Sequence, residues 1–245
     1  MSERQVVGKK EERAVTERIG TIGKPLYHHW SARDYVQSGL VFQYDGIENN
    51  GYGVHADSGK WIDLISSTPS YGSMSFDDNS VTIAGGSLYN VYYGSTMPQT
   101  LVSVLASGTS TVEWCAKVAE IDSGNASRNQ LFYNYASSSM CVAMAYVVIG
   151  GKTTWTTLNY SGGYAILSRA AIQDGSNGRI LDNITGTEWN ATGCTQVTPS
   201  VFRSQLYFVA GTISHLYAYR VYNRVLTADE IAYNSRIDKL RFGIP

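Results

Sequence analysis

The chain has 245 residues, of which 43% are hydrophobic and 12% aromatic, enough to build a sizeable buried core. Its formal net charge is -1 and only 16% of its residues are charged, so nothing indicates the basic surface that binds nucleic acid. The charged start lacks the apolar run of a signal peptide, and no later segment is long and apolar enough to span a membrane. We therefore expect no nucleic acid partner, no membrane insertion and synthesis in a reducing cytoplasm.

The first 35 residues differ from the rest of the chain in charge. Residues 1–24 hold ten of the chain's 19 basic and 20 acidic side chains, mixed in sign, and too few aliphatic residues to form a core. Two interpretations remain open for this segment: a solvated tail, or an arm that becomes ordered by docking on another protein. The basic residues that would anchor such an arm are Arg4, Lys9, Lys10, Arg13 and Arg18.

A short lead-in and a long series of strands follow. Ser31 and Asp34 have the spacing of a capping box and predict one helical turn, which Gly39 would end. Short runs rich in β-branched and aromatic residues then alternate with turn residues, and these runs predict a sandwich or barrel rather than alternating strands and helices. The expected strands are 39–46, 60–66, 80–86, 87–94, 111–121, 130–136, 140–150, 153–160, 164–172, 178–183, 205–213 and 215–223.

The end of the chain combines a strand with a capped helix. Both faces of the last expected strand carry residues that suit burial, as in a strand that lies between two covered surfaces. Thr227 then has the position of an N-cap, and Glu230 completes a capping box. Leu226 and Ile231 are placed as a hydrophobic staple. The pattern predicts a helix over residues 228–240.

Both ends of this pattern resemble one known family. The run RVYNRVLTADEIAYNSRIDKLRF, residues 220–242, resembles the closing motif of laminin-G-like jelly-roll domains of the concanavalin A-like lectin/glucanase superfamily. YVQSGLVFQYDGIENNG (35–51) followed by KWIDL (60–64) resembles the opening of the same domains. The resemblance implies an all-β, two-sheet antiparallel jelly-roll sandwich of the concanavalin A-like kind over residues 36–245. A short C-terminal helix would close it and an extended N-terminal arm, residues 1–35, would precede it.

The superfamily includes glucanases, and the sequence bears on that activity. Glucanases of the laminarinase type resemble one another in an E-x-D-x-x-E strand, which supplies two catalytic carboxylates. Here Glu120 and Asp122 begin such a motif, but Asn125 stands where the second Glu would be. The histidines show no nucleophile or metal-ligand spacing. We therefore expect no catalytic residues and a chain that is not an enzyme.

Ligand binding is predicted for aromatic side chains on loops and exposed strands, because a ring plane stacks on the face of a pyranose. The candidates are Tyr52, His55, Tyr92, Tyr93, Trp155, Tyr160 and Trp189. Packing in the core or at its rim is the alternative for each of them, and Trp61 and Trp114 are expected in the core. The oxygen-rich loops 45–57 and 77–79 could hold Ca²⁺, as in many members of the superfamily. Turn formation explains these loops equally well, so no metal ligand is assigned.

The family usually works outside the cell, whereas this chain has a charged arm and no export signal. A place in a bacteriophage virion would explain how a domain of this family works outside the cell without an export signal, because virion proteins are assembled in the host cytoplasm and meet the exterior after lysis. The expected function is therefore that of a non-enzymatic virion surface protein, a head decoration, fibre or tail component. Its arm would bind other virion proteins, its lectin-like domain would bind host-surface glycans, and it would form a homo-oligomer. The alternatives are a purely structural decoration protein, a secreted or surface adhesin module, and a divergent glycoside hydrolase.

Overall fold

The computed structural model describes most of the chain after the first 29 residues. The described residues are 30–50, 53–54, 60–70, 75–77, 79–82, 88–93, 98–118, 130–134, 140–143, 146–149, 152–155, 165–194, 205–209 and 213–244. Ser31–Pro245 form one compact unit. Residues 1–29 of the expected arm, which include its five basic residues, lie outside the described residues, and the division of the chain at residue 35 stays a prediction.

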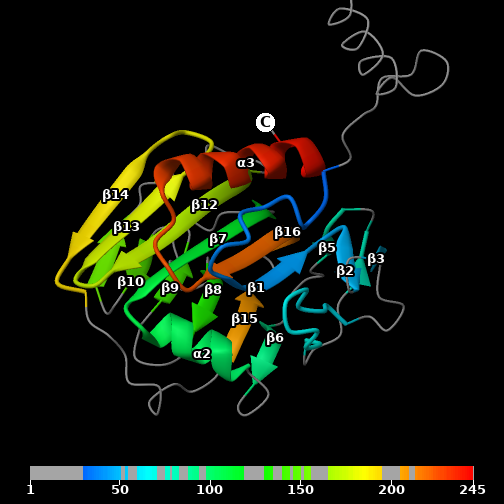
Figure 1. The fold of residues 1–245 in the computed structure, drawn as a ribbon, viewed down its shortest axis with the longest axis horizontal. Coiled ribbons are helices and arrows are strands. Elements are labelled where there is room, and N and C mark those ends of the chain that lie inside the picture. The colour runs from blue at the N-terminus through cyan, green and yellow to red at the C-terminus, as the bar shows by residue number, and fades with distance from the viewer. Residues whose placement is uncertain are drawn as a thin grey trace, which may run out of the picture. The chain divides into compact units, whose positions relative to one another are not determined.

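The larger sheet has eight antiparallel strands (Figure 1). Its order is β14 (Glu188–Thr192), β13 (Asn177–Asp182), β12 (Ala165–Asp174), β7 (Thr109–Val118), β16 (Ile213–Tyr222), β5 (Val81–Thr82) and β4 (Ser75–Phe76), and β1 (Leu40–Asp45) also pairs with β16. The three central strands, β12, β7 and β16, are ten residues long each.

The second sheet has six antiparallel strands. Its order is β11 (Lys152–Trp155), β10 (Tyr146–Ile149), β9 (Met140–Ala143), β8 (Gln130–Asn134), β15 (Gln205–Val209) and β6 (Leu88–Tyr93). The two sheets contact each other through β10 with β12 and β11 with β14. A small separate pair joins β2 (Glu48–Asn50) to β3 (Gly53–Val54). The predicted all-β, two-sheet antiparallel sandwich is confirmed.

Helix α3 (Ala228–Phe242) covers the outer face of the larger sheet (Figure 1). Its capping box is formed as expected: the Thr227 hydroxyl accepts from the Glu230 amide at 3.2 Å, and the Glu230 carboxylate accepts from the Thr227 amide at 2.9 Å. Leu226 and Ile231 are both fully buried in one apolar cluster. Gly243, with φ 65°, ends the helix two residues later than predicted.

Strand β16 is buried on both faces, as its sequence predicts. Residues 216–222 are at most 8% exposed, because α3 covers one face and an aromatic core covers the other. In that core Phe42 packs edge-on against Tyr219, with ring centroids 5.9 Å apart. Tyr44 stacks on Trp61 at 4.4 Å. Trp61 and Trp114 are 0% exposed, which confirms their assignment to the core.

Three local predictions are wrong. Residues 60–66 form no continuous strand: Ile62 makes an isolated β-bridge with Pro69, and residues 64–66 form a turn. The Asp63 carboxylate holds this turn, because it accepts hydrogen bonds from the amides of Gln43 at 2.8 Å and Ser66 at 3.0 Å. Residues 140–150 form two strands, β9 and β10, paired as a hairpin. The Ser31 amide does bond to the Asp34 carboxylate at 2.6 Å, but the segment closes a turn and no helix.

Two elements carry no clear sequence signal. Helix α2 (Gln99–Ala106) begins after Pro98 without a side-chain cap, and it lies between β6 and β7 in the chain. Strand β14 has five residues of alternating exposure and stands at the edge of the larger sheet. The expected elements include neither of them, nor the short strands β2, β3 and β4, and β14 matters most because it carries Trp189.

Candidate functional site

Trp189 is the one predicted ligand-binding side chain that belongs to the described part of the chain. Tyr52, His55 and Tyr160 lie outside it. For the other three, the structure describes the strand but not the side chain: Tyr92 and Tyr93 are on β6, and Trp155 is on β11. Strands β6 and β11 form opposite edges of the six-stranded sheet, so these predicted positions do not form one site. In contrast, β11 contacts β14, which brings the strands of Trp155 and Trp189 together.

The indole of Trp189 rests on a buried cation. Trp189 is half-buried and lies opposite Ile180 of β13 in the strand register. The guanidinium carbon of Arg169, on β12, lies over the indole at 5.4 Å from the ring centroid. Arg169 itself is 0% exposed. The ring therefore has a guanidinium against one face while part of it stays accessible at the edge of the sheet.

Arg169 is held by one carboxylate and is not fully satisfied. Its Nε donates to Asp182 Oδ2 at 3.2 Å, and its Nη2 forms an ion pair with the same oxygen at 3.2 Å. Asp182 Oδ1 accepts from the amides of Ile184 and Thr185, at 3.0 Å each, and so fixes the turn after β13. Among the described residues, Nη1 of Arg169 has no hydrogen-bond acceptor, and the contact of Nη2 with Asp182 lacks the geometry of a hydrogen bond. Buried donors without acceptors are rare and cost stability, so this arginine requires an explanation beyond packing.

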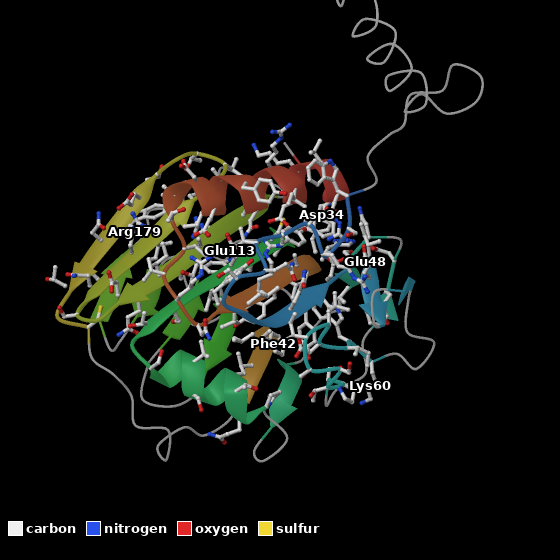
Figure 2. All side chains as sticks on the ribbon, viewed as in Figure 1. Asp34, Phe42, Glu48, Lys60, Glu113 and Arg179 are labelled. Carbon is white, nitrogen blue, oxygen red and sulfur yellow. The ribbon has the colours of Figure 1, made fainter. Side chains whose placement is uncertain are left out.

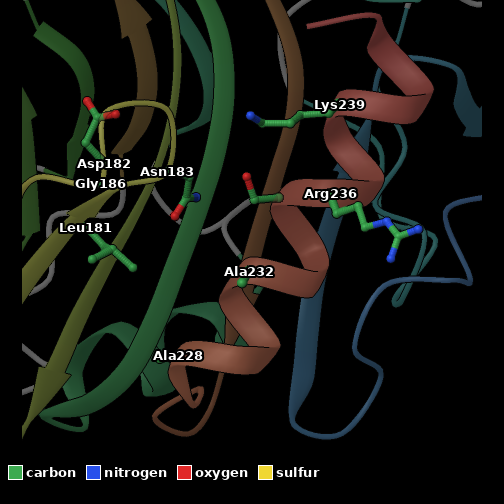
Figure 3. Close-up of a pocket in the computed structure, with 9 residues that line it drawn as sticks. Leu181, Asp182, Asn183, Gly186, Ala228, Ala232, Arg236 and Lys239 are labelled. Carbon is green, nitrogen blue, oxygen red and sulfur yellow. The ribbon is translucent and has the colours of Figure 1, made fainter. Parts of the chain in front are cut away.

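A groove of about 400 Å³ lies between α3 and the turn that follows β13 (Figure 3). Leu181, Ala228 and Ala232 line its apolar part. Asn183, Ser235 and Lys239 line its polar part, together with Asp182, Gly186 and the stem of Arg236. Nothing in the sequence singles these residues out, because the groove joins two segments that are about 50 residues apart in the chain.

A second buried arginine, Arg220 on β16, joins α3 to the sheet. Its Nη1 and Nη2 donate to the two oxygens of Asp238 at 2.8 and 2.7 Å, and its Nε donates to Glu113 at 3.1 Å. Glu113 lies beneath α3 (Figure 2), and Asn234 donates to it at 2.8 Å. Tyr35 covers the guanidinium with its ring at 4.0 Å. Burial raises the pKa of Glu113 to about 7, although Arg220 opposes this shift.

The carboxylates at the predicted calcium loops already have protein partners. Asp45 forms an ion pair with Arg241, with Nη2 at 2.9 Å from Oδ1. Asp77 accepts from the Ser80 amide at 2.7 Å and lies 3.4 Å from His215. Most of the first loop is outside the described residues, and the rest of the described chain gathers no three His, Cys, Asp or Glu side chains around a point. The calcium prediction is therefore untested.

Three further observations concern the cysteines, membrane insertion and the glucanase motif. Cys115 is a buried free thiol, and Cys194 is also buried. No helix in the described part of the chain has the length and hydrophobicity needed to cross a membrane. Glu120, Asp122 and Asn125 lie outside the described residues, so the structure does not place the incomplete glucanase motif.

No protein-family model matches the chain, and no curated protein matches it either. Solved structures do resemble it. Trypanosoma rangeli sialidase, in complex with a difluorinated ketodeoxynononic acid, has 13% identity and a TM-score of 0.52, over 96% of this chain and 39% of the sialidase. Domain 4 of AbnA, a GH43 extracellular arabinanase from Geobacillus stearothermophilus, in complex with arabinotriose, has 12% identity and a TM-score of 0.54, over 80% of this chain and 98% of that domain.

These similarities correct one expectation and leave two others untested. The prediction that the chain is not an enzyme is contradicted, because two solved structures that resemble it are a glycoside hydrolase and a domain of one. The missing second Glu argued against one catalytic arrangement only. The narrower laminin-G assignment and the phage setting are not tested by these similarities. At 12–14% identity they show the fold alone, and this chain spans less than two fifths of the sialidase: it has a β-sandwich fold that glycoside hydrolases also contain.

Proposed function

We propose that the chain binds glycans at the edge where β14 and β11 meet. The observation that carries this proposal is the half-buried indole of Trp189 lying on the buried guanidinium of Arg169. Aromatic rings at an accessible edge stack on the apolar face of a sugar, and the polar rim of the sugar stays in water. The domain of AbnA that has this fold was solved with arabinotriose, which supports a glycan as the ligand class.

Arg169 acts in this proposal as a positioning residue. A cation over an indole face stabilises the pair by about 0.5–2 kcal/mol, more when it is desolvated as here. The guanidinium therefore limits rotation of the Trp189 ring before any ligand arrives. A binding group that is already oriented loses less conformational entropy when the ligand binds. The contact of β11 with β14 makes Trp155 a second candidate for the same edge.

The test is binding of the full-length protein to intact bacterial cells and to a polysaccharide panel that includes arabinotriose. We expect saturable binding that Trp189→Ala weakens by at least about tenfold, the loss of one stacking contact. Tyr233→Ala is the matched control, because Tyr233 is 43% exposed on α3, which packs on the opposite face of the larger sheet from Trp189. Equal binding by wild type and Trp189→Ala would contradict the proposal. Release of reducing ends in the same samples distinguishes hydrolysis from recognition.

We propose further that this binding serves a bacteriophage virion surface protein, whose first 35 residues dock on other virion proteins and whose sandwich meets host glycans. The mixed charge of residues 1–24 supports a docking arm. A secreted or surface adhesin and an accessory domain of a glycoside hydrolase are the alternatives. The test is particle incorporation of the full chain and of residues 31–245, which keep the Tyr35 bond to Asp238 and form one compact unit. Incorporation of the shortened protein at the full-length level would overturn the virion proposal and leave glycan binding intact.

A further inference from the structure

The groove between α3 and the β13 turn has an apolar part and a polar part (Figure 3). Ala228 and Ala232, one helical turn apart, leave room beside the helix, and Leu181 lies across from them. Further along the helix, Ser235 and Lys239 face the turn, and Lys239 points toward it in Figure 3. At about 400 Å³ the groove has the size of a small-ligand site.

The polar part of the groove offers donors and an acceptor in fixed places. Asn183 is oriented by two hydrogen bonds to Ser168. Its backbone amide donates to the Ser168 carbonyl at 2.8 Å, and its side-chain Nδ2 donates to the Ser168 hydroxyl at 3.2 Å. The Asn183 side-chain oxygen is therefore available as an acceptor. Ser235 adds a hydroxyl, and Lys239 adds an ammonium group with three donors.

The positive charge of Lys239 in the groove is not neutralised by Asp182, the carboxylate that lines the same groove. Asp182 is paired with Arg169 and bonded to two backbone amides, so its charge is already compensated. Within the described part of the chain, Lys239 forms no ion pair with any Asp or Glu. A small ligand that matches the groove would carry an anionic group beside Lys239, hydroxyls beside Asn183 and Ser235, and an apolar face on Leu181 and Ala232.

We propose that this groove is a separate binding site for an acidic sugar, with the sugar carboxylate beside Lys239. A uronic acid has the required combination of one carboxylate, several hydroxyls and an apolar ring face. The site lies on the α3 side of β13, whereas Trp189 belongs to the opposite face of the sheet, because its partner Ile180 alternates with Leu181 along β13. The groove therefore does not depend on the Trp189 edge.

The experiment titrates digalacturonic acid, and its neutral counterpart galactobiose, into the full-length protein and follows binding by calorimetry. We expect saturable binding of the acid and at least tenfold weaker binding of the neutral disaccharide. Lys239→Gln should weaken binding of the acid about tenfold or more, the effect of removing one charge-assisted hydrogen bond. Ala232→Leu, at an exposed helix position, should block the groove without affecting the fold.

Arg33→Gln is the matched control. Arg33 is an exposed cation of the lead-in turn and does not line the groove, so this variant should bind within about twofold of wild type. Equal losses in Lys239→Gln and Arg33→Gln would indicate general attraction to surface cations and overturn the proposal. No saturable binding of digalacturonic acid to wild type would also overturn it. Trp189→Ala should bind digalacturonic acid as wild type does, which separates this site from the glycan-binding edge.

Discussion

The two buried arginines of the larger sheet, Arg220 and Arg169, differ in how completely they are satisfied. Both are at most 1% exposed. Arg220 bonds to Asp238 and Glu113 and lies under the Tyr35 ring. Arg169 has one carboxylate and leaves two nitrogens without acceptors in the described structure. Arg220 thus joins α3 to the sheet, whereas Arg169 lies beside an accessible tryptophan.

The partners of Arg220 also explain why the ends of the chain carry the most specific sequence motifs. The Tyr35 hydroxyl donates to Asp238 at 2.7 Å, which ties the lead-in to the terminal helix. Arg241 of the same helix pairs with Asp45 at the end of β1. Gly39 adopts φ 79°, and a Cβ there would lie 2.8 Å from Asn223 Oδ1. The opening and closing motifs thus form one contact region, so their residues constrain each other.

The largest expected effect is the loss of stability when Arg220 is replaced, which should exceed the loss when Arg169 is replaced. Arg220→Met leaves two carboxylates, Glu113 and Asp238, buried without their cation, and we expect the free energy of unfolding to fall by about 3–5 kcal/mol. Urea denaturation followed by circular dichroism measures this loss. A loss below about 1 kcal/mol would show that the ion network does not hold α3 on the sheet.

Arg169→Met should cost less than Arg220→Met. It leaves only Asp182 without its cation, and that carboxylate keeps two backbone amide donors. It also removes two donors that have no acceptor, so we expect a loss of about 1–3 kcal/mol. The same urea series provides the comparison. A loss as large as that of Arg220→Met would contradict the difference between the two sites.

The pH dependence of stability should follow Glu113. Its pKa is raised to about 7 in the folded protein, because burial disfavours the charged form. Folding therefore favours the protonated acid: this contribution is full below the ordinary pKa of Glu and is lost as the pH rises toward 7. We expect stability to fall by about 1–2 kcal/mol between pH 5 and 7.5 from this group. Glu113→Gln should flatten that part of the profile, and an unchanged profile would exclude Glu113 as its origin.

The exposed ion pair of Arg224 and Glu230 at the start of α3 should change stability with pH in the direction opposite to Glu113. Bonds from Arg224 and the Thr227 amide lower the pKa of Glu230 to about 2, so its contribution is present above the ordinary pKa and is lost as the pH falls. Because the pair is about 30% exposed, solvent screens it. Adding 1 M salt should therefore change stability less in Glu230→Gln than in wild type, whereas equal salt effects would contradict this account.

The smallest expected effect concerns the cap of α3. Thr227→Ala removes the side-chain acceptor for the Glu230 amide, and about 1 kcal/mol of stability should be lost. Thr227→Ser retains the oxygen and should stay close to wild type. Thermal unfolding of the three proteins checks the order, and equal melting temperatures for Ala and Ser variants would contradict it.

Local signals explain what the sequence predicts well. Three features depend only on residues a few positions apart: the cap at Thr227, the hydrophobic staple of Leu226 with Ile231, and the burial of β16 on both faces. The strand expected at 60–66 is wrong because the Asp63 carboxylate accepts from the Ser66 amide and also from the Gln43 amide, 20 positions away, which no local pattern reveals.

The site was only partly predictable for the same reason. Trp189 is identifiable as an aromatic residue in a polar stretch, but its support by Arg169 depends on the register of three strands. The groove depends on the packing of α3 beside the turn after β13, which no local pattern encodes. Sequence patterns thus indicate which side chains suit a ligand, and the fold decides which of them meet.

The most direct test of the account is the affinity of wild type, Trp189→Ala and Tyr233→Ala for the glycan that wild type binds most tightly in the panel. The account predicts that Trp189→Ala loses at least about tenfold in affinity while its unfolding transition stays cooperative, and that Tyr233→Ala binds like wild type. Undiminished affinity of a folded Trp189→Ala protein would contradict a binding site at the β14 edge.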